Sequence, residues 1–414
     1  MVPCVVIPTF WTNSRGRGSE KNLFSVYDHP TPIDQDGTLP VCLRSLENVQ
    51  GLGRVVLVVA ATDPATEHQA EDRVRSILAD FPGIDVLVFG PAELGSLHRR
   101  FEQVEFADMI RGVNLSGYGA VRNVGLIAAA VLGSESVVFL DDDQVITDKG
   151  FLLRAMDGLG MRLNDGRAVL AKTGYYTDSE GRHQRHHEPR FCDTFWRQND
   201  AYNAALGIVD APPRIQVSSM AFGGCLALHS HMFSAVSFDP WVMRGEDMDY
   251  VINARMHGGD IFLDGEWSVV HKPPKADSEA LQFRQDVYRF IYEHRKLEFA
   301  KSQVDLRQVS IESLMPYPGP FLGSSITWKA RVTALLRWIA CKEGGRYFTI
   351  ARSTVADAEE YALENCQNYF DFQRRWPMLM DRIWDDEPLR SLFTGERKMD
   401  RSAITGRFPV QRGD

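Results

Sequence analysis

Residues 137–143 of the chain read VVFLDDD, an apolar run that ends in three consecutive carboxylates. The apolar part has the length of a buried strand, and an Ala-rich segment with helical character, residues 118–132, precedes it. Further strand-like runs lie upstream at residues 2–8, 54–61 and 84–89, with helical patterns between them. Strands that alternate with helices predict a mostly parallel sheet covered by helices on both faces.

The pattern becomes less regular after residue 168. Residues 168–173 and 217–228 are strand candidates, and the polar, aromatic and His-rich stretch between them, residues 175–213, is predicted to be an ordered loop or lid. Residues 261–270 read as a late pair of strands that is broken at Asp264-Gly265.

The chain changes character again after Pro273-Pro274. Residues 276–301 and about 328–384 are predicted to be helical, with a break at 316–325, and residues 385–414 form a weakly patterned tail. We therefore expect an α/β domain over residues 1–275 and a mainly helical domain over residues 276–414. The aromatic residues of the second domain predict core packing or a homodimer interface.

Composition narrows the classes of function. With 44% hydrophobic and 24% charged residues in 414, the chain can bury a core and is not predicted to be disordered. The net charge of −9 argues against a nucleic-acid partner. No apolar run reaches the roughly 18–20 residues of a transmembrane helix. The six cysteines show no CxxC pair, so we expect neither a disulfide framework nor a zinc ribbon, and a reducing, cytoplasmic setting.

The three carboxylates after the apolar run indicate a metal site. Asp141, Asp142 and Asp143 repel one another, and a hard divalent cation that binds through oxygen removes the cost of holding them together. The carboxyl end of a strand in a parallel sheet is also where ligands bind. The alternative is a solvated acidic turn or a helix cap.

Two later segments add polar groups. Gly223 and Gly224 allow the backbone to approach a ligand, and Glu246-Asp247 opens a helix after Gly245. Carboxylates at a helix start are well placed to accept a proton or a ligand hydroxyl. The simpler alternative for one of them is the role of helix cap.

A histidine and a lysine follow the last strand candidate. His271 is a possible metal ligand, and Lys272 is suited to contact a phosphate. A hydrogen-bonded structural histidine is the alternative.

In their order along the chain, these motifs resemble the nucleotide-sugar glycosyltransferases of the GT-A fold, and glycosyltransferase family 2 in particular. The resemblance covers residues 2–275. It rests on these segments in order: Ile7-Pro8-Thr9, Thr62-Asp63, Arg122-Asn123 followed by Gly125, Asp141-Asp142-Asp143, Gly223-Gly224 and Gly245-Glu246-Asp247. It implies a GT-A fold, a Rossmann-like, mostly parallel mixed sheet with helices on both faces, here with a helical C-terminal domain.

The resemblance also implies a set of site residues. Asp247, with Glu246 beside it, corresponds to the catalytic base of inverting members. A divalent metal, Mn²⁺ or Mg²⁺, is implied at Asp141, Asp143 and His271. The donor-binding set that it implies is Pro8, Thr9, Phe10, Asp63, Gly119, Arg122, Asn123, Asp141, Asp142, Gly223, Gly224 and Lys272.

The function implied is a metal-dependent glycosyltransferase, a hexosyltransferase that moves a sugar from a UDP- or GDP-sugar donor to a hydroxyl of a small-molecule or glycan acceptor. The Gln-x-x-Arg-Trp motif of processive synthases is absent after Asp249, so a processive membrane synthase is not expected. The layout also resembles mannosylglycerate-synthase-like enzymes, which are retaining, so the stereochemical outcome stays open.

Two other functions remain at this point. A sugar-phosphate nucleotidyltransferase would have a Gly-rich basic loop after the first strand, and Arg15-Gly16-Arg17-Gly18 matches such a loop in part. The second alternative is a catalytically silent nucleotide-sugar binding protein. The His-rich residues 183–187, with Arg182 and Arg190, are predicted to belong to a polar lid, with an anionic acceptor site or a second metal site as the alternatives.

Overall fold

The computed structural model describes residues 2–13, 27–274 and 278–395. Within these residues the chain builds one ten-stranded mixed sheet, in the order β4-β3-β1-β5-β9-β7-β10-β6, with β2 paired to β1 and β8 to β10. The strands are β1 (Cys4–Thr12), β2 (Thr31–Pro32), β3 (Val55–Ala61), β4 (Val86–Phe89), β5 (Ser136–Phe139), β6 (Gln144–Val145), β7 (Ala171–Thr177), β8 (Ile215–Val217), β9 (Leu226–His229) and β10 (Phe262–His271).

The first four strands of this order, β4, β3, β1 and β5, run parallel. Strand β9 is antiparallel to both β5 and β7, whereas β10 is parallel to β7 and antiparallel to β6. The sheet therefore has a parallel half, built from the N-terminal βα units, and a mixed half that follows it.

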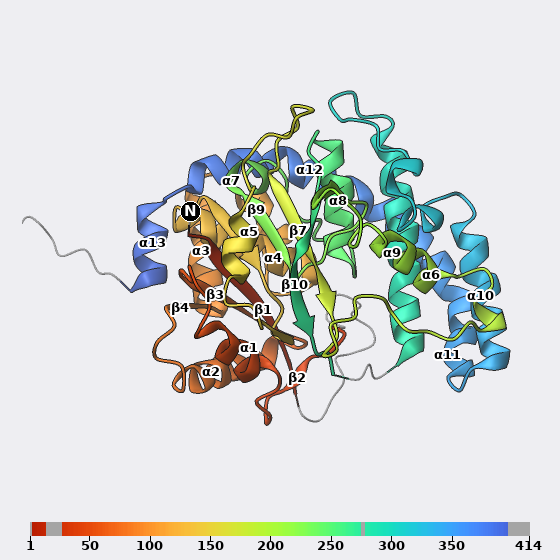
Figure 1. The fold of residues 1–414 in the computed structure, drawn as a ribbon, viewed down its shortest axis with the longest axis horizontal. Helices are drawn as coiled ribbons and strands as arrows, with labels where there is room; N and C mark the ends of the chain where they lie inside the picture. Colours follow the sequence, from red (N-terminus) through yellow and green to blue (C-terminus); the bar gives the residue numbers. More distant parts are fainter. Residues whose placement is uncertain (1, 14–26, 275–277, 396–414) are drawn as a thin grey trace, which may run out of the picture.

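Helices flank the sheet (Figure 1). Before residue 275 they are α1 (Leu39–Leu46), α2 (Glu67–Leu78), α3 (Pro91–Gln103), α4 (Tyr118–Val131), α5 (Phe151–Met156), α6 (Gln198–Leu206), α7 (Ser230–Phe233) and α8 (Glu246–Met256). The shorter helical segments are η2 (Pro64–Thr66), η3 (Ala107–Gly112), η4 (Phe191–Asp193), η5 (Glu312–Leu314), η6 (Gly319–Phe321) and the π-helical η7 (Ile350–Thr354).

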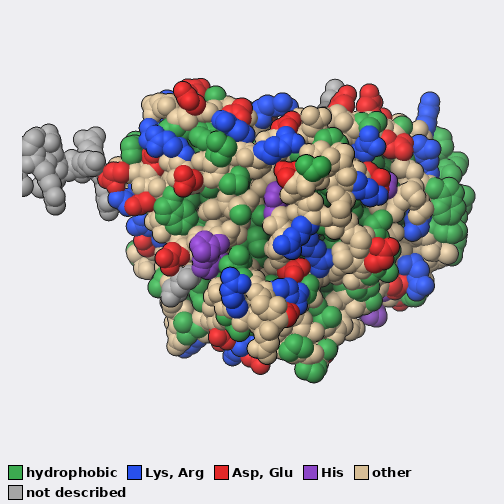
Figure 2. Space-filling model, turned by 90° about the horizontal axis from the view of Figure 1, so that it is seen from above, with side chains coloured by type: hydrophobic (Ala, Val, Ile, Leu, Met, Phe, Trp, Pro, Cys, Tyr) green, Lys and Arg blue, Asp and Glu red, His purple; other side chains and the backbone are tan. Residues whose placement is uncertain are grey.

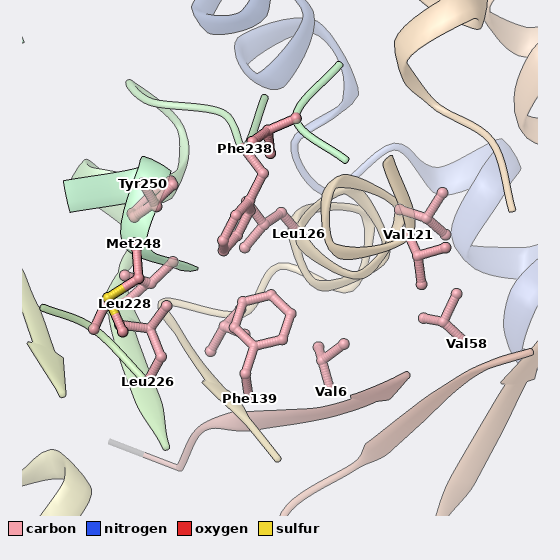
Figure 3. Packing of buried hydrophobic residues seen from close by; sticks show 14 of the residues in the cluster. Val6, Val58, Val121, Leu126, Phe139, Leu226, Leu228, Phe238, Met248 and Tyr250 are labelled. Atoms are coloured by element: carbon pink, nitrogen blue, oxygen red, sulfur yellow. The ribbon is translucent and has the colours of Figure 1, made fainter. Parts of the chain in front are cut away.

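Helix α4 forms the centre of the core. All of its residues after Tyr118 are buried, and its small Ala and Gly side chains allow the helix to lie close to the sheet. Figure 3 shows Val121 and Leu126 of α4 facing Val6 of β1 and Phe139 of β5. An alanine-rich helix between a sheet and other helices is buried all round rather than amphipathic.

The C-terminal region is helical. It consists of α9 (Glu279–Ala300), α10 (Ile326–Ala340), α11 (Gly344–Thr349), α12 (Val355–Ile383) and α13 (Glu387–Thr394). Helix α12 packs on α9 and α4, and α13 reaches the β4 edge of the sheet, where Phe393 lies 5.3 Å from Phe89 between ring centroids. The predicted fold class, a mixed α/β sheet flanked by helices with a helical C-terminal region, is confirmed, whereas the division into two domains at residue 275 stays a prediction.

Some predicted elements were wrong. Residues 217–228 do not form one strand, because β8 ends at Val217 and residues 218–225 turn before β9 begins. The predicted strand pair at 261–270 is the single strand β10, whose register against β7 shifts between Leu263 and Ser268. Asp264, which resembled a turn residue, is buried inside β10 and pairs with Lys172 and Arg214.

The predicted lid and tail also contain regular structure. The lid region begins inside β7, which ends at Thr177, and includes α6. The tail begins with α13, which its composition did not indicate, and the other tail residues, 396–414, lie outside the described part of the chain. None of the described helices is long and apolar enough to cross a membrane.

A buried ion network joins the helical region to the sheet region. The ammonium of Lys296 on α9 lies 2.7 Å from Asp239 Oδ2 and 2.8 Å from Asp249 Oδ2 on α8. Tyr292 also donates to Asp239, and all these side chains are buried. Removing one partner of such a network leaves uncompensated charge inside the protein.

We expect Lys296→Met to lower the free energy of unfolding by about 3–5 kcal/mol, because Asp239 and Asp249 would then face each other without a cation. The measurement is urea unfolding at neutral pH. The matched control is Lys301→Met, which removes an exposed ion pair with Glu298 and should change stability by less than about 0.5 kcal/mol. Equal effects of the two substitutions would contradict the structural role of the network.

Candidate functional site

The site begins where β5 ends. The three aspartates follow β5 after Leu140, and the short strand β6, which comes directly after them, pairs with the end of β10 through Gln144 and His271. This pairing places His271 beside Asp143, with 3.2 Å between Nε2 and Oδ2. The other Asp143 oxygen, Oδ1, is buried and has no hydrogen-bond partner among the described residues.

Arg122 lies buried at the centre of the site. Its guanidinium donates to Asp141 Oδ1 at 3.0 Å, to Glu246 Oε1 at 2.6 Å and to the carbonyl of Gly223 at 3.0 Å. One side chain of α4 thus joins the end of β5, the start of α8 and the turn before β9. All four of these predicted site residues are brought together.

The two acids at the start of α8 have different surroundings. Glu246 is buried against Arg122, and burial raises its pKa to about 7 despite the opposing charge of Arg122. Asp247 is only partly buried, and its two oxygens accept hydrogen bonds from the backbone N–H groups of Gly223 and Met248. A carboxylate that accepts two hydrogen bonds still has lone pairs for a ligand, so Asp247 is the better placed of the two to meet one.

Tyr176 is a site residue that the sequence analysis missed. Its hydroxyl donates to Asp141 Oδ2 at 3.2 Å and accepts from the N–H of Gly224 at 2.7 Å. Its ring lies 4.8 Å from the ring of His271 between centroids. Nothing in the sequence distinguishes Tyr176 from the adjacent Tyr175, because only the register of β7 against β10 decides which of the two points into the site.

Gln144 was also missed. Its side-chain oxygen accepts from the N–H of Asp141, and its amide nitrogen lies 3.4 Å from Asp141 Oδ2. Arg122, Tyr176 and Gln144 together surround the Asp141 carboxylate, so both of its oxygens have protein partners.

The turn before β9 passes close to these groups because it has no side chains there. A Cβ added to Gly224 would lie 2.1 Å from Gln144 Nε2 and 2.5 Å from Asp141 Oδ2. Any other residue at this position would force both groups to move. The Gly-Gly pair is therefore required by close backbone approach, as its sequence suggested.

The end of β1 forms the other wall. Thr9 donates to Asp142 Oδ2 at 2.6 Å, and the Phe10 ring packs on Tyr27 and Tyr118 with centroids 4.1 and 5.1 Å away. Burial, with a further contribution from Asp143, raises the pKa of Asp142 to about 8. Pro8 pairs with β3 inside the sheet.

The remaining predicted donor residues lie around this centre without joining its hydrogen bonds. Asp63 is exposed at the end of β3 and caps η2. The Asn123 amide makes both of its bonds with the backbone of Phe238. Gly119 packs against the carbonyl of Asp239, and Lys272 is exposed beside Asp143, whose carbonyl accepts its backbone N–H.

The predicted metal ligands meet only in part. Asp143 and His271 are in contact, whereas Asp141 is turned to Arg122 and Tyr176. Across the described ranges, no three His, Cys, Asp or Glu side chains are grouped so as to hold a metal by themselves.

The His-rich segment makes ion pairs of its own. His183 lies 3.3 Å from Asp210 and His187 lies 2.7 Å from Asp200, while Arg190 contacts Asp193 and Glu279. His183 and His187 each pair with a different aspartate, which fits the predicted polar lid better than a second metal site. Arg15-Gly16-Arg17-Gly18, the partial echo of a nucleotidyltransferase loop, lies outside the described residues.

Comparison with known proteins gives likeness of fold at low identity. No family model and no curated protein matches the chain. A mannosyltransferase from Pyrobaculum calidifontis, solved with GDP-Man and Mn²⁺, aligns over 93% of this chain and 88% of its own, at 13% identity and a TM-score of 0.47.

Two more solved structures align over shorter stretches. GalNAc-T7 with UDP, GalNAc and Mn²⁺ aligns over 79% of this chain and 56% of its own, at 11% identity and a TM-score of 0.39. CMP:2-keto-3-deoxy-manno-octonic acid synthetase with CTP aligns over 68% and 95%, at 13% identity and a TM-score of 0.28. At these values the likenesses carry no conclusion about activity, so we argue the function from the residues of the site.

We expect Gly224→Ala to lower the free energy of unfolding by about 1–3 kcal/mol, because the new methyl group overlaps Gln144 and Asp141. The measurement is thermal or urea unfolding. Gly83→Ala is the control, because a Cβ at Gly83 meets no atom within 4 Å, and it should cause no loss of stability. A Gly224→Ala protein as stable as wild type would show that the turn is not closely packed.

Proposed function

We propose that the chain is a metal-dependent glycosyltransferase, a hexosyltransferase that moves a sugar from a UDP- or GDP-sugar to an acceptor hydroxyl. The observation that carries the proposal is that Arg122 lies between two clusters of acidic side chains. On one side lie the aspartates after β5, with His271, and on the other lies the start of α8 with the partly buried Asp247. Diphosphate binding needs the first group and proton removal needs the second.

The residues present fit a hard divalent cation, Mn²⁺ or Mg²⁺. Asp143 has a buried oxygen without a hydrogen-bond partner in the described residues, and its other oxygen faces His271. Mg²⁺ is commonly held by one or two carboxylates, with substrate phosphates completing its shell. We propose Asp143 and His271 as direct ligands, with Asp141 as the third predicted ligand. When bound, the ion would act as a Lewis acid that neutralises the departing diphosphate.

We propose that the donor lies along the end of β1 and the start of α4. The Phe10 ring and the Thr9–Asp142 pair are placed for the nucleoside, and Asp63 lies at the end of the neighbouring strand. Lys272 is exposed beside Asp143 and is suited to contact a phosphate. Gly223 and Gly224 let the backbone of that turn lie directly against Arg122 and Asp141, beside which we propose the sugar.

We propose Asp247 as the base that takes the proton of the acceptor hydroxyl. The N–H groups of Gly223 and Met248 fix its orientation. Glu246 is buried against Arg122 and acts by positioning that arginine. This assignment of Asp247 belongs to an inverting reaction, and NMR of the anomeric proton of the product tests it.

Donor binding should depend on metal and on Asp143. With wild-type protein we expect a UDP- or GDP-sugar to raise the unfolding midpoint in the presence of Mn²⁺ or Mg²⁺, and EDTA to abolish the shift. Asp143→Ala should remove the metal-dependent part, whereas Asp148→Ala, which alters an exposed aspartate paired with Arg154, should keep it. A shift that is the same in Asp143→Ala would contradict the assignment of the metal site.

Transfer should depend on Asp247 more than donor binding does. We expect Asp247→Ala to keep the metal-dependent midpoint shift and to lose about 100- to 10,000-fold in kcat, because a general base contributes a factor of this size. The measurement is release of nucleoside diphosphate with an accepted acceptor, and Asp148→Ala again serves as the control. Unchanged turnover would remove Asp247 from the mechanism.

The same assays separate the two alternatives. Formation of inorganic diphosphate from a nucleoside triphosphate and a sugar phosphate would identify a nucleotidyltransferase. A metal-dependent midpoint shift without turnover for any acceptor or for water would indicate a binding protein.

A further inference from the structure

Helix α10 exposes four large apolar side chains. Its buried face includes the small residues Ala330, Thr333 and Ala334. Its exposed face carries Trp328, Leu335, Trp338 and Ile339, at spacings of three, four and seven residues, and Ile339 is 76% exposed. Helices of globular proteins normally bury such a stripe, so an exposed one indicates a surface that binds something.

Two neighbouring aromatic residues extend this stripe. Phe195 of the lid packs edge-on against Trp328 with centroids 5.0 Å apart, and Phe348 of α11 lies 4.8 Å from Trp338. Both are exposed themselves. We call these six residues the α10 patch: Phe195, Trp328, Leu335, Trp338, Ile339 and Phe348. In Figure 2 hydrophobic side chains cover the right-hand edge of the molecule, the end at which Figure 1 places α10 and α11.

Exposed cations lie beside the patch. Of the six Lys and Arg in residues 326–354, Arg331 pairs with Glu359 of α12, Arg337 with Asp193 and Arg346 with Glu343. Lys342 and Arg352 are exposed and have no ion-pair partner within the described ranges. Tryptophan at an apolar surface flanked by unpaired cations is typical of helices that lie at the interface of an anionic bilayer.

We propose that the α10 patch docks on the surface of a membrane that contains anionic lipid. The apolar side chains would enter the boundary between headgroups and acyl chains, while Lys342 and Arg352 would face lipid phosphates. A second copy of this chain is the other candidate occupant, and the oligomeric state of the patch variants tests it. The α10 patch is separate from the candidate site, so docking does not depend on the proposed transferase activity.

A cavity of about 790 Å³ lies beside the end of α10. Ala340, Lys342 and Tyr347 line it from α10 and the segment after it, and lid residues 189–192 line it from the other side. Pro189, Arg190 and Phe191 of that lid also line a second cavity of about 480 Å³, which reaches Arg244, two residues before Glu246. A bilayer bound at the patch would lie beside the first of these cavities.

Vesicle co-sedimentation of the full chain tests the docking. We expect binding to vesicles of phosphatidylcholine with 30% phosphatidylglycerol and little binding to phosphatidylcholine alone. Raising the salt to about 0.5 M should weaken it, because the attraction between surface charges is screened. Lys342→Ala should lower partitioning about fivefold, and Ile339→Asp combined with Trp338→Asp should lower it at least tenfold.

Two control variants distinguish a loss of membrane binding from a loss of folding. Ile339→Asp alone alters a side chain that is mostly in water, so its unfolding midpoint should equal that of wild type while vesicle binding falls. Leu392→Asp, on α13 at the other end of the molecule, is the matched apolar-to-acidic control and should bind as wild type does.

Two results would overturn the proposal. One is the absence of binding to the anionic vesicles, or binding that the patch variants do not alter. The other is a dimer in sedimentation velocity that Ile339→Asp converts to a monomer, since this would assign the patch to a second copy. Loss of transfer with vesicle binding intact would count against the proposed activity and not against docking.

Discussion

The buried guanidinium of Arg122 is the interaction on which the geometry of the site depends. A cation taken out of water on α4 must be compensated, and only carboxylates and carbonyl oxygens close to it can do this. Its partners come from the residues after β5, the turn before β9 and the start of α8. The hydrogen bonds of this one guanidinium therefore fix three segments, of which the first and the last are more than 100 residues apart in the sequence.

The helical C-terminal region contributes to the site through α8. Lys296 of α9 binds Asp249 of α8, and Arg289 packs against Gly245, the residue before Glu246 and Asp247, which has a φ of +70°. A Cβ at Gly245 would lie 2.3 Å from that guanidinium. The start of α8 is thus held between Arg122 on the sheet side and α9 on the other, so the proposed base does not depend on a free loop for its position.

The carboxylates of Asp141, Asp142 and Asp143 differ in their hydrogen-bond partners. Asp141 is surrounded by Arg122, Tyr176 and Gln144, Asp142 is held by Thr9, and Asp143 keeps one buried oxygen without a partner in the described chain. Three adjacent aspartates with similar sequence surroundings thus have three different local environments. Such differences in hydrogen bonding and burial decide which carboxylate is available to an ion.

The alternation of strands and helices in the first half of the chain could be predicted from the amino-acid pattern, because apolar periodicity reflects burial directly. The order of the aspartates, the Gly-Gly pair and Glu246-Asp247 along the chain, through its resemblance to the GT-A family, also indicated that these segments belong to one site, and Arg122 joins them.

Other features of the site depend on contacts between residues that are far apart in the sequence. Tyr176 enters the site, and His271 meets Asp143, because of strand register between β7, β10 and β6, which no local pattern encodes. Asp264 looked like a turn residue until Lys172 and Arg214 were placed beside it. The outward face of α10 has the same spacing as a buried one, and only the position of neighbouring helices shows which side meets water. Local sequence sets which residues share a face, and long-range packing sets what that face meets.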